Sequence, residues 1–185
     1  MSCRSFRLRE FCKDSDAVAA VEFAIVLPFM LLLYIGGIEL ANGMAISVKV
    51  TDTTHTVADL VSQNKCVTSA QVTTILNASS KVIAPYAISN AVVTISELTT
   101  TSDGKSATVA WSQALNGTPR SQGQSIALPQ SLQGLSSNTG LIYGEVSYFY
   151  TPGLGYTISG TVAISDSYFL YPRQSTLVPL QTSCP

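Results

Sequence analysis

The single histidine of the chain lies between two aspartates at spacings that suit a helix. Asp52, His55 and Asp59 are separated by three and four residues, so on a helix they would share one face. Imidazole and carboxylate groups can bind a metal ion or accept a proton, which makes this face a candidate metal site or general base. A solvated polar face explains the same residues, and we favour that interpretation.

The other groups that could carry chemistry lack the spacing of a catalytic or cofactor-binding motif. Gly153-Leu154-Gly155 follows a proline and is too sparse for a nucleotide-binding loop, so we interpret it as a turn. The serines lack a nucleophile-elbow motif, and the four cysteines lack the close spacing of a zinc site. We therefore expect no enzyme activity, no cofactor and no metal.

One carboxylate stands inside a long apolar run. Residues 17–38 are apolar except for Glu22, and these 22 residues can span a bilayer core of roughly 30 Å as a helix. A carboxylate in hydrocarbon costs about 2.5–3.5 kcal/mol, so Glu22 either reaches the headgroups or meets a cation inside an assembly. Pro28 removes a helical hydrogen bond and predicts a kink, which membrane helices tolerate.

We interpret the apolar run as a retained membrane helix. It is too long for the core of a cleaved signal, and it lacks the polar face of a buried helix. Basic residues precede it, and the next cation is Lys49, so the N-terminus is expected in the cytoplasm and the remainder outside, in a bacterial periplasm. The expected organisation is a leader (1–17), a transmembrane helix (18–38), a juxtamembrane helix (39–64) and a periplasmic domain (65–185).

This topology places the four cysteines in two different compartments. Cys3 and Cys12 lie in the leader, where the cytoplasm keeps thiols reduced, whereas Cys66 and Cys184 lie outside, where disulfides form. We predict a Cys66–Cys184 disulfide, and the alternative is a bond to another subunit.

The residues around Glu22 resemble a known family. Residues 17–28, AVAAVEFAIVLP, behind a basic leader, resemble the TadE-like minor pilins (pseudopilins) of tight-adherence pili. The segments Tyr150-Thr151-Pro152 and Tyr171-Pro172-Arg173 resemble the same family's C-terminal pattern. The resemblance implies a pilus component whose partners are other pilins, platform proteins and the prepilin peptidase.

The resemblance also implies roles for individual residues. A prepilin peptidase would cut between Ala17 and Val18, which makes Glu22 the fifth mature residue and Phe23 the aromatic sixth. The family has glycine before the cut, where this chain has Ala17. Glu22 would neutralise the new amino terminus of a neighbouring subunit and set the register between subunits.

Periodicity predicts an α+β fold. The first helix is expected to continue with Leu40, Met44, Val48, Val57, Leu60 and Val61 on one stripe, with a break near Thr51. A second helix begins at Thr68 or Ser69 and ends at Pro85, with an apolar stripe of Val72, Ile75, Leu76, Val82 and Ile83. About four antiparallel strands follow. Alternating apolar residues indicate the first strand at Ala91, Val93 and Ile95 and the second at Ala107, Val109 and Trp111. The third strand is expected over 141–150, and the fourth has Tyr156, Ile158, Val162, Ile164 and Tyr168 on one face. Residues 116–140 form a surface loop with an edge strand near Ile126.

A structural role fits this composition best. Only 11% of the residues are charged and the net charge is -1, so nothing suggests a nucleic-acid partner. Gly36 and Gly37 would let helices approach closely in the membrane. The alternative is a permanently anchored periplasmic binding or adhesion module, and an anchored hydrolase comes last. A cluster of tyrosines (Tyr143, Tyr148, Tyr150, Tyr156, Tyr168, Tyr171) fits cross-strand packing better than a binding face.

Overall fold

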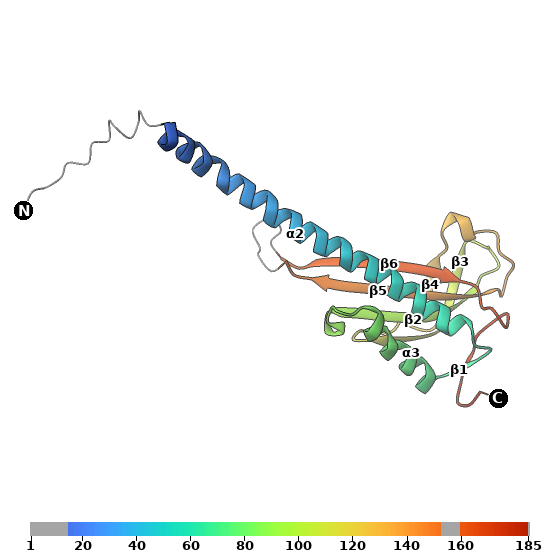
Figure 1. Ribbon diagram of the computed structural model, residues 1–185. Helices are drawn as coiled ribbons and strands as arrows, with labels where there is room; N and C mark the ends of the chain where they lie inside the picture. The colour runs from blue at the N-terminus through green and yellow to red at the C-terminus, as the bar shows by residue number, and fades with distance from the viewer. Residues whose placement is uncertain (1–14, 153–159, 185) are drawn as a thin grey trace, which may run out of the picture. The chain divides into compact units, whose positions relative to one another are not determined.

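The computed structural model describes residues 15–152 and 160–184 (Figure 1). The chain divides into two compact units, one of residues 1–42 with 152–159 and the other of residues 43–151 with 160–185. The turn expected at Gly153-Leu154-Gly155, and the start of the last strand at Tyr156 and Ile158, lie outside the described residues. The element content is α+β, as the sequence predicts.

Helix α2 runs without interruption from Ser15 to Ser62, so the break expected near Thr51 is absent. Threonine hydroxyls in this region donate to backbone carbonyls one turn earlier. Thr53 donates to Lys49 over 2.7 Å and Thr54 donates to Val50 over 2.8 Å. These hydroxyls are thereby satisfied along the helix and do not divert its backbone hydrogen bonds.

The buried face of α2 differs in part from the expected one. Its buried apolar residues in the larger unit are Ile46, Val50, Val57, Ala58 and Val61. Leu40, Met44 and Val48 are instead 63%, 62% and 62% exposed. A helix turns about 100° per residue, so positions 44 and 48 lie opposite positions 46 and 50, and both sets have helical spacing.

Helix α3 spans Ser69–Val82 and begins with a reciprocal cap. The Thr68 hydroxyl accepts from the backbone N–H of Gln71, whose side chain accepts from the backbone N–H of Thr68 over 2.8 Å. Val72 and Leu76 are buried against the core, and the helix closes at Ile83 before Pro85. The predicted start, stripe and end of this helix are confirmed.

The sheet has five antiparallel strands in the order β4-β3-β2-β5-β6, one more than the approximate count of four. The additional strand is the short β4, which pairs with β3 at the sheet edge, where an edge strand was expected. The strands are β2 (Ala91–Thr100), β3 (Ser106–Leu115), β4 (Ser125–Ala127), β5 (Gly140–Tyr150) and β6 (Val162–Leu170). Short 3-10 helices occupy Ile88–Asn90 (η1) and Gln130–Leu132 (η2).

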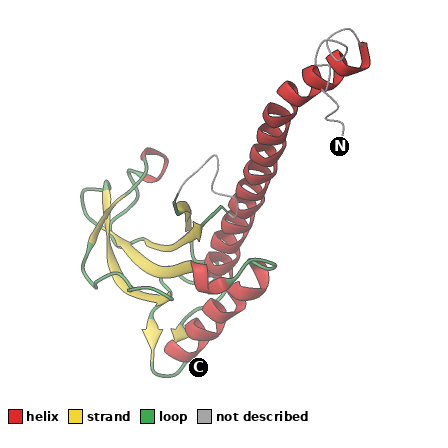
Figure 2. Cartoon of the chain, turned by 90° about the vertical axis from the view of Figure 1, so that its left-hand side faces the viewer, coloured by secondary structure: helices red, strands yellow, loops and turns green. Residues whose placement is uncertain are grey.

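The two faces of the sheet bury different clusters. Figure 2 shows α3 and the C-terminal part of α2 on one face, the inner face, where Val93, Ile95 and Val146 join the helix core. Glu97 pairs with Trp111 and Leu98 pairs with Val109, so Ala110 is an extra residue in β3. This bulge leaves Trp111 in the inner core and places Val109 on the outer face, which Leu98 of β2 reaches by ordinary alternation. There Leu98 packs with a second cluster, which also contains Ala107, Val109, Leu128, Leu141 and Tyr143.

Glycine is required where α2 crosses the sheet. A Cβ atom built on Gly144 of β5 would lie 3.1 Å from the carbonyl oxygen of Thr54 and 3.3 Å from the Ala58 side chain. Any side chain here would push the helix outward, so the absence of a Cβ sets the close contact between α2 and β5.

The C-terminal strap, residues 173–184, binds the larger unit at several points. The backbone N–H of Arg173 donates to Ser62 over 2.9 Å, and Gly140 donates to Thr176 over 3.2 Å. Strand β7 (Leu180–Gln181) pairs in parallel with β1 (Val67–Thr68). The Cys66 and Cys184 sulfur atoms are bonded at 2.10 Å, so the strap is covalently tied to the segment between the two helices.

Candidate functional site

The N-terminal part of α2 presents apolar side chains all around its axis. It contains the one helix segment of the described residues that is long and apolar enough to cross a membrane. No part of its most apolar window is buried, whereas the core helix of a soluble domain is mostly buried. The large exposed side chains are Val18, Val21, Phe23, Ile25, Val26, Leu27, Phe29, Met30, Leu31, Leu32, Leu33, Tyr34 and Ile38. Such a surface is suited to lipid or to other apolar helices.

The residues assigned to this segment from sequence all lie on α2. Glu22 and Phe23 are exposed one turn after Val18, and Pro28 is inside the helix. Gly36 lies 14 residues after Glu22, close to four full turns, so the two share nearly the same face. A Cβ atom added to Gly37 would meet no heavy atom within 4 Å, so this surface is open. The geometry leaves the carboxylate and Gly37 exposed, whereas Gly36 is half-buried.

The comparison with known families decides the character of this segment. Residues 17–59 match the family model described as TadE-like protein. The chain carries a TadE-like segment. The resemblance predicted from residues 17–28 is thereby confirmed. No curated protein and no solved structure matches the chain.

The TadE-like match has a functional meaning at the level of the family. It indicates an association with the tight-adherence pilus, because the TadE-like family to which this segment is similar is a structural family of that pilus. The apolar helix in the same segment fits anchoring in a membrane. Tyr150-Thr151-Pro152 and Tyr171-Pro172-Arg173 lie outside the matched residues, so their resemblance to the family stays a prediction.

The face of α2 around His55 packs against the sheet edge. The imidazole stacks on Tyr168 of β6, with ring centroids 3.9 Å apart and planes 24° apart. Asp59 forms an ion pair with Arg173 of the strap. Among the described residues no group of three or more histidine, cysteine, aspartate or glutamate side chains is arranged to hold a metal ion. His55 and Asp59 therefore attach other segments to α2.

Three tyrosines of the cluster, Tyr143, Tyr148 and Tyr168, make ring contacts. Tyr148 meets Tyr86 edge to face at 6.1 Å, and Tyr143 stacks on Phe169 across the β5–β6 pair at 4.3 Å. Tyr148 and Tyr143 are buried, and Tyr171 is exposed. Tyr156 lies outside the described residues. These contacts fit the cross-strand packing that the sequence favours.

A buried carboxylate holds the strap and was not found from the sequence. Glu97 of β2 is 2% exposed and accepts a hydrogen bond from the backbone N–H of Val178. The Trp111 indole N–H donates to the backbone carbonyl of Val178 over 2.8 Å. Burial raises the pKa of Glu97 above its ordinary value of 4.5, while the bonds from Val178 and Trp111 oppose that rise. A glutamate in a strand of otherwise uncharged residues was the available signal.

Proposed function

We propose that the chain is a minor pilin or assembly component of a tight-adherence pilus. Residues 18–38 anchor it in the inner membrane, the basic leader lies in the cytoplasm, and the α+β domain lies in the periplasm. The TadE-like match and the exposed apolar helix support this proposal, and the leader's basic residues support the orientation. Its partners are other pilins, platform proteins and the prepilin peptidase.

The exposed apolar stripe beyond the expected span carries this proposal. Met44 and Val48 lie on the side of α2 opposite its buried residues, and each is 62% exposed. Val48 lies ten residues after Ile38, about 15 Å farther along the helix at 1.5 Å per residue. Apolar surface facing water costs roughly 25 cal/mol per Å². Lateral packing against helices of other pilins would cover this stripe and remove its apolar surface from water.

A polar contact would set the register of that packing. Cleavage between Ala17 and Val18 would create an amine at the start of each subunit, and Glu22 would pair with the amine of a neighbouring subunit. A carboxylate and an ammonium group attract strongly where water is excluded, which offsets their desolvation. Phe23, Pro28, Gly36 and Gly37 would shape the surrounding helix contacts.

Site-directed cross-linking in the native membrane tests this assembly. In a chain without the leader cysteines, Val48→Cys should cross-link to a second pilin, identified by mass spectrometry of the linked band. Asn77→Cys, on the exposed side of α3, is the matched control and should not. If Val48→Cys links no more than Asn77→Cys does, the stripe is not a helix-packing surface and the proposal loses its main support.

The second candidate function is a permanently anchored binding or adhesion module. Ala17 favours it, because the family has glycine before the cut. The N-terminal sequence of the protein from its native membrane separates the two. A start at Val18 establishes processing, whereas a start at Met1 or Ser2 leaves Glu22 without the proposed amine and favours the anchored module.

A further inference from the structure

The outer face of the sheet contains a hollow that the preceding functions do not use. Its volume is about 320 Å³, and one side is formed by the loop after β3, which ends at β4. The lining residues are Val92, Thr94, Thr118, Pro119, Arg120, Ser121, Gln124, Glu145 and Ser147. Ligand pockets in proteins have volumes of roughly 300–1,000 Å³, so this hollow suits a small ligand.

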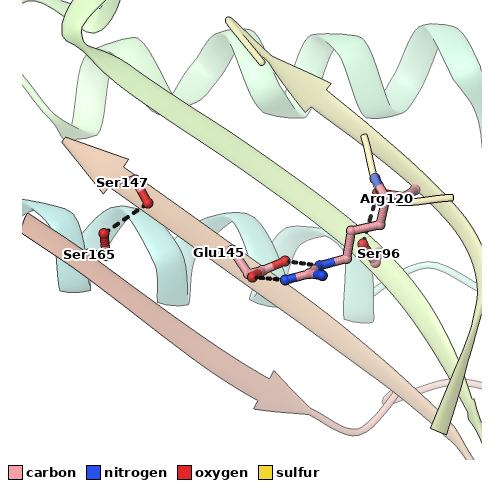
Figure 3. A network of polar contacts seen from close by, with 6 residues as sticks. Ser96, Arg120, Glu145, Ser147 and Ser165 are labelled. Atoms are coloured by element: carbon pink, nitrogen blue, oxygen red, sulfur yellow. Dashed lines mark hydrogen bonds and ion pairs between the residues drawn. The ribbon is translucent and has the colours of Figure 1, made fainter. Parts of the chain in front are cut away.

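An ion pair fixes the loop that forms this side. Arg120 donates to Glu145 of β5 through two nitrogens, Nε to Oε2 over 2.6 Å and Nη2 to Oε1 over 2.5 Å (Figure 3). Its backbone N–H donates to the Ser112 hydroxyl over 3.1 Å, and its guanidinium lies 5.7 Å from the centre of the Tyr143 ring. This pairing holds the loop in place before any ligand arrives, which reduces the entropy cost of binding.

The same ion pair leaves the hollow without net charge. Arg120 and Glu145 neutralise each other, and no other charged residue lines the space. An anionic ligand would have to compete with Glu145 for the guanidinium, and a cationic ligand would have to compete with Arg120 for the carboxylate. The electrostatics therefore favour a neutral ligand.

Hydroxyl and amide groups supply the remaining recognition chemistry. Ser147 accepts from Ser165 over 2.9 Å, so its own proton is free to donate (Figure 3). Thr94 is 7% exposed, and its hydroxyl makes no hydrogen bond to any residue in the part of the chain that the structure describes. No fully buried side-chain oxygen in that part lacks a partner, so this hydroxyl opens into the hollow. A ligand with several hydroxyl groups would satisfy it.

An exposed aromatic ring lies next to the hollow. Phe149 follows Ser147 by two residues on β5, so both side chains point to the outer face, about 7 Å apart along the strand. Phe149 is 45% exposed, although it lies on a sheet. The C–H face of a sugar ring packs well on such an apolar surface, while its hydroxyl groups reach the polar side chains.

We propose that this hollow binds a neutral carbohydrate, with one sugar ring over Thr94 and Ser147 and its apolar face toward Phe149. Hydroxyls, an amide, a carboxylate with spare lone pairs and one exposed ring together form a set of groups suited to a polyol. The site belongs to the outer face of the sheet, and it does not depend on processing of the leader or on entry into a pilus.

The test uses the full chain in lipid nanodiscs, because glycoside detergents would compete for the site. The probes are maltose, lactose and N,N′-diacetylchitobiose, followed by saturation-transfer NMR and calorimetric titration. At least one should bind saturably. Ser147→Ala combined with Gln124→Ala should weaken that binding about tenfold, the loss of roughly 1.4 kcal/mol from two hydrogen bonds. Thr73→Ala on α3 should leave it unchanged.

Two further measurements test whether the double variant is still folded and whether the ligand is neutral or anionic. The unfolding midpoint of the double variant should stay close to that of the parent, since the substitutions leave the Arg120–Glu145 pair intact and remove only the exposed Ser165–Ser147 hydrogen bond. Inorganic phosphate is the anionic probe and should not compete with the sugar. The proposal is overturned if no neutral sugar binds saturably, if the double variant binds as the parent does, or if phosphate binds in place of the sugars.

Discussion

Removal of the Cys66–Cys184 disulfide is expected to destabilise the larger unit substantially. The bond joins residues 118 positions apart. In the chain-entropy description, closing a loop of that length lowers the entropy of the unfolded chain enough to stabilise the fold by about 5 kcal/mol at 25 °C. This is comparable to the whole stability of a small domain, about 5–15 kcal/mol, so Cys66→Ser with Cys184→Ser should bring the unit close to its unfolding threshold.

Non-covalent contacts determine at which denaturant concentration the strap detaches once the disulfide is removed. Without the bond, the strap is still held by hydrogen bonds from Val178 to Glu97 and from Trp111 to Val178, and by the β1–β7 pair. Each such hydrogen bond contributes about 0.5–1.5 kcal/mol. The strap should therefore stay bound in water and detach at a lower denaturant concentration than in the parent.

The single tryptophan reports on this detachment. Trp111 is buried and its indole N–H is bonded to the strap, so its emission should change when the strap leaves. Urea titration of the full chain should show a large fall in midpoint for the double serine variant, and Cys3→Ser with Cys12→Ser is the matched control, which should show none. An unchanged midpoint in the Cys66/Cys184 variant would refute the entropic argument or show that the bond is absent.

Three further substitutions follow from particular contacts. Glu97→Gln should remove the contribution of Glu97 to the pH dependence of stability. Because the folded pKa of Glu97 is raised, that contribution is fully present below its ordinary pKa of 4.5 and is lost as pH rises through the folded pKa; urea midpoints of variant and parent across that range measure the difference. Gly144→Ala should lower the free energy of unfolding by roughly 1–3 kcal/mol, since the new Cβ would crowd the Thr54 carbonyl, and urea titration measures this. Gly37→Ala is the control and should leave the urea midpoint unchanged. Thr68→Ala should cost about 1 kcal/mol through loss of the α3 cap, seen as a lower thermal midpoint, with Thr68→Ser restoring it.

Local periodicity was enough to predict most elements of the fold. The cap at Thr68 and the alternation around Val93 both act within a few residues, and each lies where it was expected. Asp103 accepts hydrogen bonds from Thr101 and from the backbone of Lys105, which lower its pKa to about 2. Such local bonds are encoded by neighbouring residue types, so sequence reasoning can find them.

Periodicity failed where the deciding contact lies far away in the chain or outside it. Leu40, Met44 and Val48 have the spacing of a core stripe, but the sheet packs on the opposite side of α2, and local spacing cannot choose between the two. Arg120 and Glu145 are 25 residues apart, and no pattern in either segment pairs them. The strap's contacts are longer in range still, since Glu97 and Val178 are 81 positions apart.

Glu22→Gln should separate membrane insertion from assembly. No lysine, arginine or histidine occurs between Lys13 and Lys49, and Lys49 lies 27 residues after Glu22, about 40 Å along the helix. Removing the charge lowers the insertion cost, so membrane levels of the variant should match the parent. If Glu22 pairs with the amine of a processed neighbour, the variant should cross-link less from Val48→Cys, whereas Glu22→Asp should cross-link more than Glu22→Gln does. Equal cross-linking by all three chains would show that the carboxylate only reaches the headgroups and sets no register.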